Sequence, residues 1–447
     1  MSMTRKIISL LLVILLLPLV ACDTQEEPFV MPQETDTLVI YDTPFLTESL
    51  LKAITLFRAQ YPEVSVEFRR FDSVNNGDIT AYHTMLYAEL AAGQGPDIIL
   101  ESDTFTFNIG SFKRMESGVY ADLEPFFQHD ENFQMSDYHE IVLDAGVFQG
   151  KRYAVPLSFV SSYWLTTQEI LEEEGITIEE DLQDYTSLMN LLQDYRQSNP
   201  EKRLFYNIYA RQFLNDMFPW NGLPLVNIEE KQVSVDPDKL HYVIDTYRDV
   251  FYVESIVNAP SVIPNYGFGL LNRETIFQQQ GTLRDMMQAY SALKTTETPI
   301  LVNIPSFDGK VIGSPNLLAY IRENSPNQLN AYRFLKIMLS EEFQSDMYAD
   351  GIELPVLRNA MYEKTEKILS TACVRGGMTE YGMLEFSSVS LEEVNTIIDT
   401  IYEVDACVIE PAITDLFVAM LPYITREKDF EDCYTDLTNQ LTLLLNE

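Results

Sequence analysis

The segment from Thr37 to Leu100 constrains the fold most, because strand-like and helix-like patterns alternate along it. Apolar or alternating runs predict strands at 37–41, 64–68 and 98–100. Between them, apolar residues at helical spacing predict one helix that begins at Thr47 and a second over about 80–92 that ends at Gly93. Strands separated by helices imply a parallel sheet, so the segment predicts an α/β fold. In such sheets the loops after the strands, here 41–45, 71–78 and 101–107, form the ligand crevice.

Farther along the chain, two capping-box patterns predict where helices begin. Ser325 to Gln328 has the spacing of a capping box and precedes apolar residues at helical spacing, and Ser390 to Glu393 repeats that arrangement. A last helix is predicted from the apolar residues that run from Phe430 to Leu444. The chain is therefore expected to end in helices.

The first 36 residues predict export and anchoring. Arg5 and Lys6 precede an apolar run over 7–20, which is too short to span a bilayer comfortably and fits a signal peptide at 1–21. The run ends in LVAC, which resembles a lipobox, so Cys22 is expected to carry lipid; the alternative is an ordinary signal peptide followed by a chance cysteine. Residues 22–36 are then a disordered tether. The body is expected on the extracytoplasmic face of the cell membrane, anchored through lipid alone.

Composition limits the partners and the size of the fold. There are 68 acidic and 30 basic residues, a net charge of −38, which excludes a nucleic-acid partner because phosphate binding needs a basic surface. The charge has two explanations, attraction of a cation or solubility, and solubility is the simpler one. About 410 residues remain to fold, which is suited to two lobes or domains.

The sequence offers no catalytic or metal-binding motif. If Cys22 is lipidated, Cys373, Cys407 and Cys433 remain, which permits one disulfide at most and forms no CxxC or Cys/His cluster. The four histidines form no HExxH pair, and a GxSxG elbow, a P-loop and a dinucleotide fingerprint are absent. Segment 72–78 is similar to a calcium loop, but Val74 stands where an oxygen ligand is needed. We therefore expect no cofactor, no metal and no enzymatic activity.

Six segments in a fixed order resemble the family 1 extracellular solute-binding proteins of ABC importers, the family that contains maltose-binding protein. They are FRAQYP at 57–62, AGQGPDI at 92–98, GKRYAVPL at 150–157, the helix from SPN at 325–327 to LSEE at 339–342, GIELPV at 351–356, and the final helix. The resemblance covers nearly the whole mature chain. Two segments depart from it: no tryptophan follows the first strand, and 373–388 matches nothing in the family.

The resemblance implies a periplasmic-binding-protein-like fold of type II, in which two lobes, each a mainly parallel sheet flanked by helices, enclose a ligand cleft. The amino-terminal lobe would comprise 37–154 and 302–348, and the carboxy-terminal lobe 155–301 and 349–447. The chain would cross between lobes near 153–157, 300–304 and 348–355. The family's mechanism is hinge closure around the ligand, followed by docking of a monomeric receptor on the permease subunits.

A sugar site needs flat aromatic rings and planar carboxylates or amides, because a sugar has apolar C–H faces and a rim of hydroxyls. For Trp164 and Trp220, the sequence supports packing in the core and stacking on a ligand about equally. The remaining candidates follow predicted strands or lie in turn-rich loops, where a solvated side chain is the alternative: Tyr41, Phe45, Asp72, Glu101, Asp103 and Tyr266.

The leading hypothesis is a lipoprotein that captures a carbohydrate, most simply an oligosaccharide, for an ABC-type permease. Three alternatives stay open: the same role with a cationic ligand such as a polyamine, an adhesin or sensory lipoprotein with this fold, and a glycoside hydrolase with two carboxylates across a cleft. The last is the weakest, because with 68 acidic residues some pair always has a suitable spacing.

Overall fold

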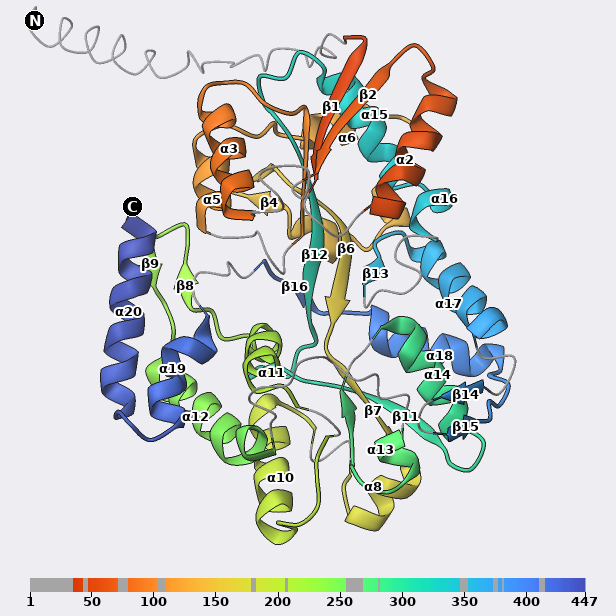
Figure 1. Cartoon of the computed structure of the whole chain (residues 1–447), viewed down its shortest axis with the longest axis vertical. Coiled ribbons are helices and arrows are strands. Elements are labelled where there is room, and N and C mark those ends of the chain that lie inside the picture. Colours follow the sequence, from red (N-terminus) through yellow and green to blue (C-terminus); the bar gives the residue numbers. More distant parts are fainter. Residues whose placement is uncertain are drawn as a thin grey trace, which may run out of the picture. The chain divides into compact units, whose positions relative to one another are not determined.

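In the computed structural model, seven strands form the main sheet, in the order β13-β6-β12-β3-β1-β2, with β16 paired to β12 (Figure 1). These strands are β1 (Thr37–Asp42), β2 (Ser65–Arg70), β3 (Ile98–Ser102), β6 (Val155–Ser161), β12 (Ile312–Ile321), β13 (Leu354–Pro355) and β16 (Ala406–Cys407). The structure describes residues 35–42, 47–70, 79–102, 109–177, 182–205, 208–254, 268–279, 282–345, 353–372, 377–379, 382–409 and 415–446. Residues Gln33–Glu447 form one compact unit that contains all of the described core.

The direction of the strands confirms the predicted start of the fold and corrects the rest. Strand β1 pairs in parallel with both β2 and β3, as the first segment of the sequence predicts. Strand β12 runs antiparallel to β3 and β6, and β13 runs antiparallel to β6. The main sheet is therefore mixed, and the prediction of mainly parallel sheets is wrong. The reason is that β12 enters this sheet at the edge where β1 and β3 end.

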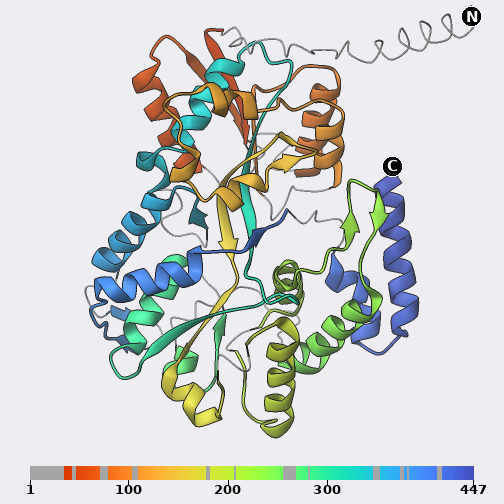
Figure 2. The same cartoon turned by 180° about the vertical axis from the view of Figure 1, so that it is seen from behind.

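A second, three-stranded sheet is antiparallel throughout. Strand β7 (Tyr163–Thr167) lies between β10 (Gln278–Gln279) and β11 (Pro299–Asn303). Only Ser162 separates β6 from β7, and residues 304–311 connect β11 to β12, so the chain passes twice between the two sheets (Figure 2). At one passage the Ser162 hydroxyl donates to the Ile304 carbonyl at 3.0 Å.

Helices cover both faces of the main sheet. On one face, α3 (Ile79–Ala91) and α5 (Ile109–Glu116) contribute Tyr82, Leu86 and Met115 to a core cluster that includes Ile99. On the other, α2 (Thr47–Gln60) packs against α15 (Gln328–Met338), with the rings of Phe57 and Phe334 5.5 Å apart. Each such side chain stabilises the fold by about 1.5–3 kcal/mol relative to exposure.

The remaining helices form three groups. Near β6 and α15 lie α6 (Glu124–His129), η4 (Met135–Asp137), α7 (Glu140–Asp144) and α16 (Glu341–Gln344). Around the second sheet lie α8 (Gln168–Glu174), α13 (Phe268–Leu271), α14 (Leu283–Leu293), α17 (Arg358–Ala372) and α18 (Leu391–Tyr402). The third group is α10 (Tyr185–Ser198), α11 (Ala210–Met217), η5 (Phe218–Asn221), α12 (Pro237–Thr246), η6 (Tyr247–Phe251), η7 (Tyr252–Glu254), α19 (Leu416–Ile424) and α20 (Phe430–Asn446). Three short hairpins complete the described elements: β4 (Val147–Phe148) with β5 (Lys151–Arg152), β8 (Val226–Asn227) with β9 (Gln232–Val233), and β14 (Gly377–Thr379) with β15 (Gly382–Leu384).

One of the two predicted capping boxes is present. At α18 the Ser390 hydroxyl and the Glu393 carboxylate cap each other's backbone N–H groups, as predicted. The prediction at Ser325 is wrong, because the N-cap position of α15 is Asn327, whose side chain makes no capping hydrogen bond. The Ser325 hydroxyl donates instead to the Asp97 carboxylate at 2.5 Å, which ties the start of α15 to the segment before β3.

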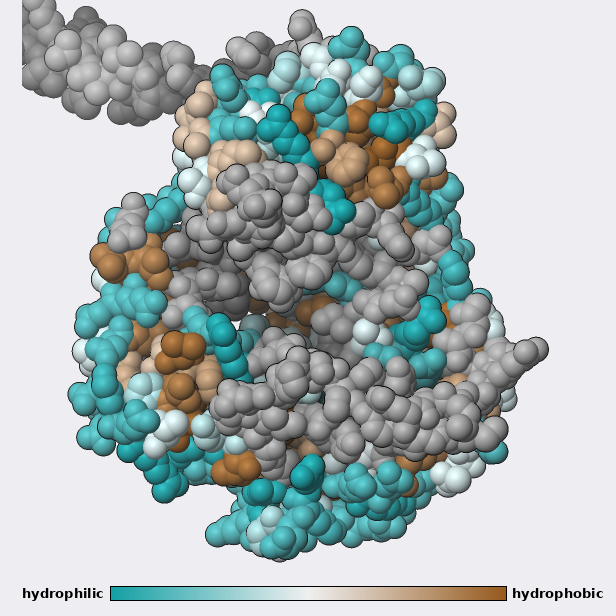
Figure 3. All heavy atoms as spheres, viewed as in Figure 1, coloured by the Kyte–Doolittle hydropathy of each residue, from teal (hydrophilic) through white to brown (hydrophobic). Residues whose placement is uncertain are grey.

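Hydrophilic residues cover much of the described part of the face that Figure 3 shows. Figure 3 shows an apolar group in its upper part, where α2 and β2 lie, and there Leu51 is 46% and Phe68 39% exposed. Within the described residues, no helix combines the length and the apolar content that crossing a membrane requires. Cys433 is a buried free thiol, and Cys373 lies outside the described residues.

Candidate functional site

Polar side chains gather at the edge of the main sheet where β1, β2 and β3 end and where β6 and β12 leave for the second sheet. The strand register shows which residues lie at this edge. Asp42 lies opposite Leu100, and Ser102 lies opposite Leu317 of β12. The next residue of β12 beyond Leu317 is Asn316. We call the residues Asp42, Glu101, Asn316 and Glu353 the junction edge, because they lie where the two sheets join.

Glu101 is a buried carboxylate with unused hydrogen-bonding capacity. It is 0% exposed, and neither of its oxygens accepts a hydrogen bond from any described residue. The nearest cation is Arg114 of α5, whose guanidinium lies 3.5 Å from Oε1. Burial raises the pKa of Glu101, and the positive charge of Arg114 opposes that rise. Among the described residues, the two oxygens of this side chain therefore have an ion-pair partner but no hydrogen-bond donor.

Arg114 also bonds to other residues of the protein. Its Nε donates to the Tyr120 hydroxyl at 2.7 Å, and one terminal nitrogen donates to Ser111 Oγ at 2.8 Å. The guanidinium also lies over the ring of Tyr87, 4.2 Å from its centroid. These contacts hold the charge beside Glu101 without directing it toward a ligand.

Glu353 and Asn316 form the other end of the junction edge. The Asn316 Nδ2 donates to Glu353 Oε1 at 2.9 Å across strand β6, while Glu353 Oε2 accepts no bond from the described chain. The pairing of β12 with β6 is irregular on both sides of Leu317, which lets the Asn316 side chain leave the regular alternation. Lys364 of α17 is buried, and its Nζ donates to the Glu353 carbonyl at 2.8 Å. Burial raises the pKa of Glu353.

Trp220 lies on the short helix η5, which packs against β12 from the side of the second sheet. Pro219 lies in the first turn of this helix, and Gly222 ends it with φ at +72°. A side chain at Gly222 would be strained by that φ and would meet Ser306 at 3.1 Å. The indole of Trp220 is half-buried, and the neighbouring Asn221 is buried with an Nδ2 that finds no acceptor in the described chain.

The other residues singled out in the sequence fall into two groups. Trp164 is 1% exposed between the rings of Phe205 and Phe277, 4.8 and 5.2 Å away, which favours core packing. Tyr41 is also buried; its hydroxyl donates to Glu89 at 2.8 Å, and burial raises its pKa to about 12. The remaining candidates lie outside the described residues: Cys22, Phe45, Asp72, Asp103 and Tyr266.

Three residues of the junction edge were not among the candidates from the sequence: Asp42, Asn316 and Glu353. Asn316 is the one side-chain amide within the apolar strand at 312–321, and Glu353 is the one charge in the segment GIELPV. In the sequence, only their position as a lone polar residue inside an apolar run could have marked these two residues as candidates for the site. The partner of each could not be identified, because the two residues are 37 positions apart.

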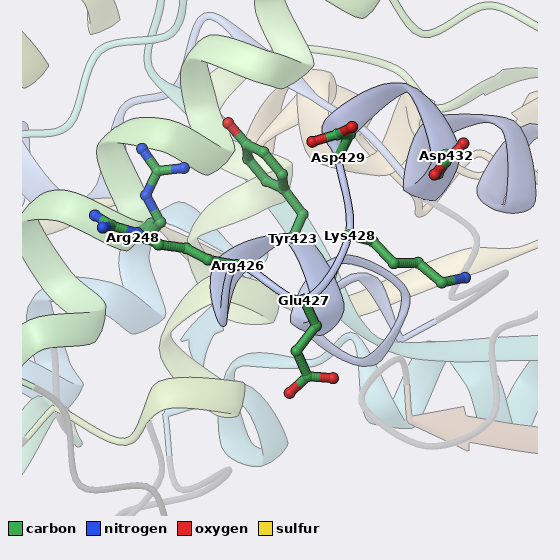
Figure 4. A pocket seen from close by; sticks show the side chains of 7 residues that line it. All are labelled: Arg248, Tyr423, Arg426, Glu427, Lys428, Asp429 and Asp432. Carbon is green, nitrogen blue, oxygen red and sulfur yellow. The ribbon is translucent and has the colours of Figure 1, made fainter.

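A separate pocket of about 420 Å³ lies where the turn from α19 to α20 meets the π-helix η6 (Figure 4). Its lining residues are Arg248, Tyr423, Arg426, Glu427, Lys428, Asp429 and Asp432. They carry charges of both signs, and Arg248 is already paired with Asp245 and Asp249 at 2.8 and 2.7 Å. In the part of the chain that is described, no group of three or more His, Cys, Asp or Glu residues is placed to hold a metal ion.

Comparisons with known proteins bear on the fold. No family model matches the chain, and no curated protein matches it. Among solved structures, the sugar-binding protein MalE from Xanthomonas citri matches with a TM-score of 0.65 at 12% identity, over 92% of this chain and 97% of its own. A family 1 extracellular solute-binding protein from Alicyclobacillus acidocaldarius matches with a TM-score of 0.57 at 14% identity, over 94% and 100%. A periplasmic oligogalacturonide-binding protein from Yersinia enterocolitica matches with a TM-score of 0.57 at 12% identity, over 92% and 99%. The chain therefore has the α/β fold of the family 1 solute-binding proteins that its sequence resembles.

Proposed function

We propose that this chain is a receptor that binds a carbohydrate outside the cytoplasm and delivers it to an ABC-type permease. The observation that carries the proposal is the fold, which matches sugar-binding receptors over more than nine-tenths of the chain. Proteins with this fold bind solutes without transforming them, and we propose the same here.

The junction edge and Trp220 together offer the kinds of group that a sugar requires. A half-buried indole at Trp220 can stack on the apolar face of a sugar ring, while Glu101 and Glu353 offer acceptors to its hydroxyls. These groups come from elements on both sides of the passages at Ser162 and 304–311. A ligand that contacts both sides would favour a closed form, which is the physical basis of hinge closure.

The proposal includes the finer assignments made from the sequence. The lobes would comprise 37–154 with 302–348, and 155–301 with 349–447. A lipid on Cys22 would hold the monomeric receptor at the outer face of the cell membrane, near its permease. Replacing Cys22→Ser tests the anchor, because the protein should then appear in the soluble fraction; if it stays with membranes, the lipid assignment is wrong.

The first test is thermal unfolding of residues 33–447 against mono- and oligosaccharides, with polyamines and amino acids as controls. A ligand that binds only the folded protein raises the midpoint. Trp220→Ala should abolish the shift while changing the midpoint of the free protein little. Trp164→Ala is the matched comparison and should destabilise the free protein by about 3–5 kcal/mol, because it empties a core site.

Three results would contradict the proposal in different ways. If only polyamines raise the unfolding midpoint, the ligand is a cation and not a carbohydrate, and the protein is still a receptor. Release of reducing sugar would indicate a hydrolase. No shift with any compound would favour an adhesin or sensory protein.

A further inference from the structure

We infer that the junction edge selects uncharged carbohydrates over acidic ones, with Glu101 and Glu353 as the residues that determine this specificity. The inference rests on the proposed receptor function and names the ligand class of that same site. It is carried by the hydrogen-bonding polarity of the site: the side-chain oxygens of Glu101 and Glu353 that accept no bond from a described residue can act only as acceptors when these carboxyl groups are ionised.

The unused acceptors are Glu101 Oε1 and Oε2 and Glu353 Oε2. All three atoms are inaccessible to bulk solvent, so a missing donor is costly, about 1–3 kcal/mol for each unsatisfied buried group. A hydroxyl can donate to such an oxygen. An ionised carboxylate of a uronic acid has acceptors only and would place like charge against like charge.

The cations beside these carboxylates, Arg114 and Lys364, are held by bonds to other groups of the protein. Arg114 is held by Tyr120 and Ser111 and stacks on Tyr87, and Lys364 donates to the Glu353 backbone carbonyl. Both side chains are at least largely buried, with Arg114 12% exposed. The one unused donor found near Trp220 is the amide Nδ2 of Asn221, which is neutral and serves a hydroxyl as well as a carboxylate.

This polarity distinguishes the chain within its own fold, because the solved structures that it matches include an oligogalacturonide-binding protein. A receptor for such a ligand must supply donors to carboxylates. At the described part of the junction edge, this chain supplies acceptors.

The test compares each neutral oligosaccharide that raises the unfolding midpoint with the same oligosaccharide oxidised to the uronic acid at C6, and titration calorimetry gives both Kd values. The acidic form should bind at least about tenfold more weakly, the effect of one repulsive contact in a partly buried site. Glu353→Gln replaces an acceptor oxygen by an N–H donor and should narrow the ratio of the two Kd values severalfold. Glu101→Gln should also narrow this ratio. Because the substitution removes the counter-charge of Arg114, the unfolding midpoint of the variant is measured to check that the protein remains folded.

Glu341→Gln is the matched control, because it removes the same charge from an exposed position on α16 and should leave the ratio unchanged. Equal binding of neutral and oxidised forms overturns the inference and leaves the receptor intact. If neither glutamine variant changes the ratio of the two Kd values, the inference is also overturned, because Glu101 and Glu353 then do not determine the specificity. If no oligosaccharide of either kind binds, the proposed function fails and the inference fails with it.

Discussion

Gly146 shows how a single residue limits what this fold tolerates. It follows α7, and its carbonyl accepts hydrogen bonds from the backbone N–H groups of Tyr153 and Ala154, both at 3.2 Å. A Cβ atom at this position would lie 1.9 Å from the Ala154 carbonyl oxygen. Two backbone segments therefore approach each other where only glycine fits. Gly118 differs, because its φ is +71° and nothing lies within 4 Å of a Cβ atom there.

Replacing these two glycines separates crowding from backbone strain. Gly118→Ala should cost about 1–2 kcal/mol, the cost of a left-handed conformation for an alanine. Gly146→Ala should cost about 3 kcal/mol or more, because backbone atoms must move. Urea denaturation of both variants gives the two free energies of unfolding. Equal losses would show that the segment after α7 moves easily and that the close approach is not essential.

At the scale of an element, α18 is fixed by its first turn. The Ser390 hydroxyl accepts from the Glu393 N–H at 3.3 Å, and the Glu393 carboxylate accepts from the Ser390 N–H at 2.7 Å and from Lys294 of α14 at 2.5 Å. Burial opposes ionisation of Glu393, but the bonds from Lys294 and Ser390 outweigh it, so its pKa lies below the ordinary 4.5. The same carboxylate thus caps one helix and ties it to another.

Glu393→Gln should lower the free energy of unfolding by roughly 1–2 kcal/mol at neutral pH, the combined effect of a cap and a partly exposed ion pair. Because the folded protein lowers this pKa, the stabilisation is complete above about pH 4.5 and is lost as the pH falls through the folded value. Denaturation between pH 7 and pH 3 should show the difference from the unmodified protein shrinking below pH 4.5. Glu392→Gln, exposed in the same turn, is the control; if both variants lose stability equally, the cap and the ion pair contribute little.

At the scale of the whole molecule, the net negative charge destabilises the folded state. The chain carries 68 acidic and 30 basic residues, so acidic residues outnumber basic ones by more than two to one. A net charge this far from zero favours solubility while it destabilises the folded state through self-repulsion. Screening acts over about 10 Å at 0.1 M salt, which is comparable with the spacing of surface charges.

Raising the salt concentration should therefore stabilise the free protein. We expect the unfolding midpoint to rise between 10 mM and 300 mM sodium chloride, by roughly 2 °C for each 1 kcal/mol of relieved repulsion. Tetramethylammonium chloride at the same concentrations should give the same rise if screening is the cause. A larger rise with sodium would indicate a bound cation instead, and an unchanged midpoint would show that the surface charges are already balanced locally.

The sequence by itself determined the elements that depend on local pattern. The parallel start from β1 to β3, the beginning of α2 at Thr47 and the cap of α18 were all predicted, because periodicity, caps and turns are read within a few residues. The fold class followed from the alternation of strands and helices, together with the resemblance to a known family.

Only the tertiary structure decided which distant segments meet. It set the antiparallel direction of β12, placed Trp164 in the core and left Trp220 half-buried, although both tryptophans were equally open readings in the sequence. It also joined Asn316 to Glu353 across β6. Hydrophobic pattern states that a residue is apolar or polar, but burial and pairing depend on neighbours supplied by other parts of the chain, and these exist only once the sheets have formed.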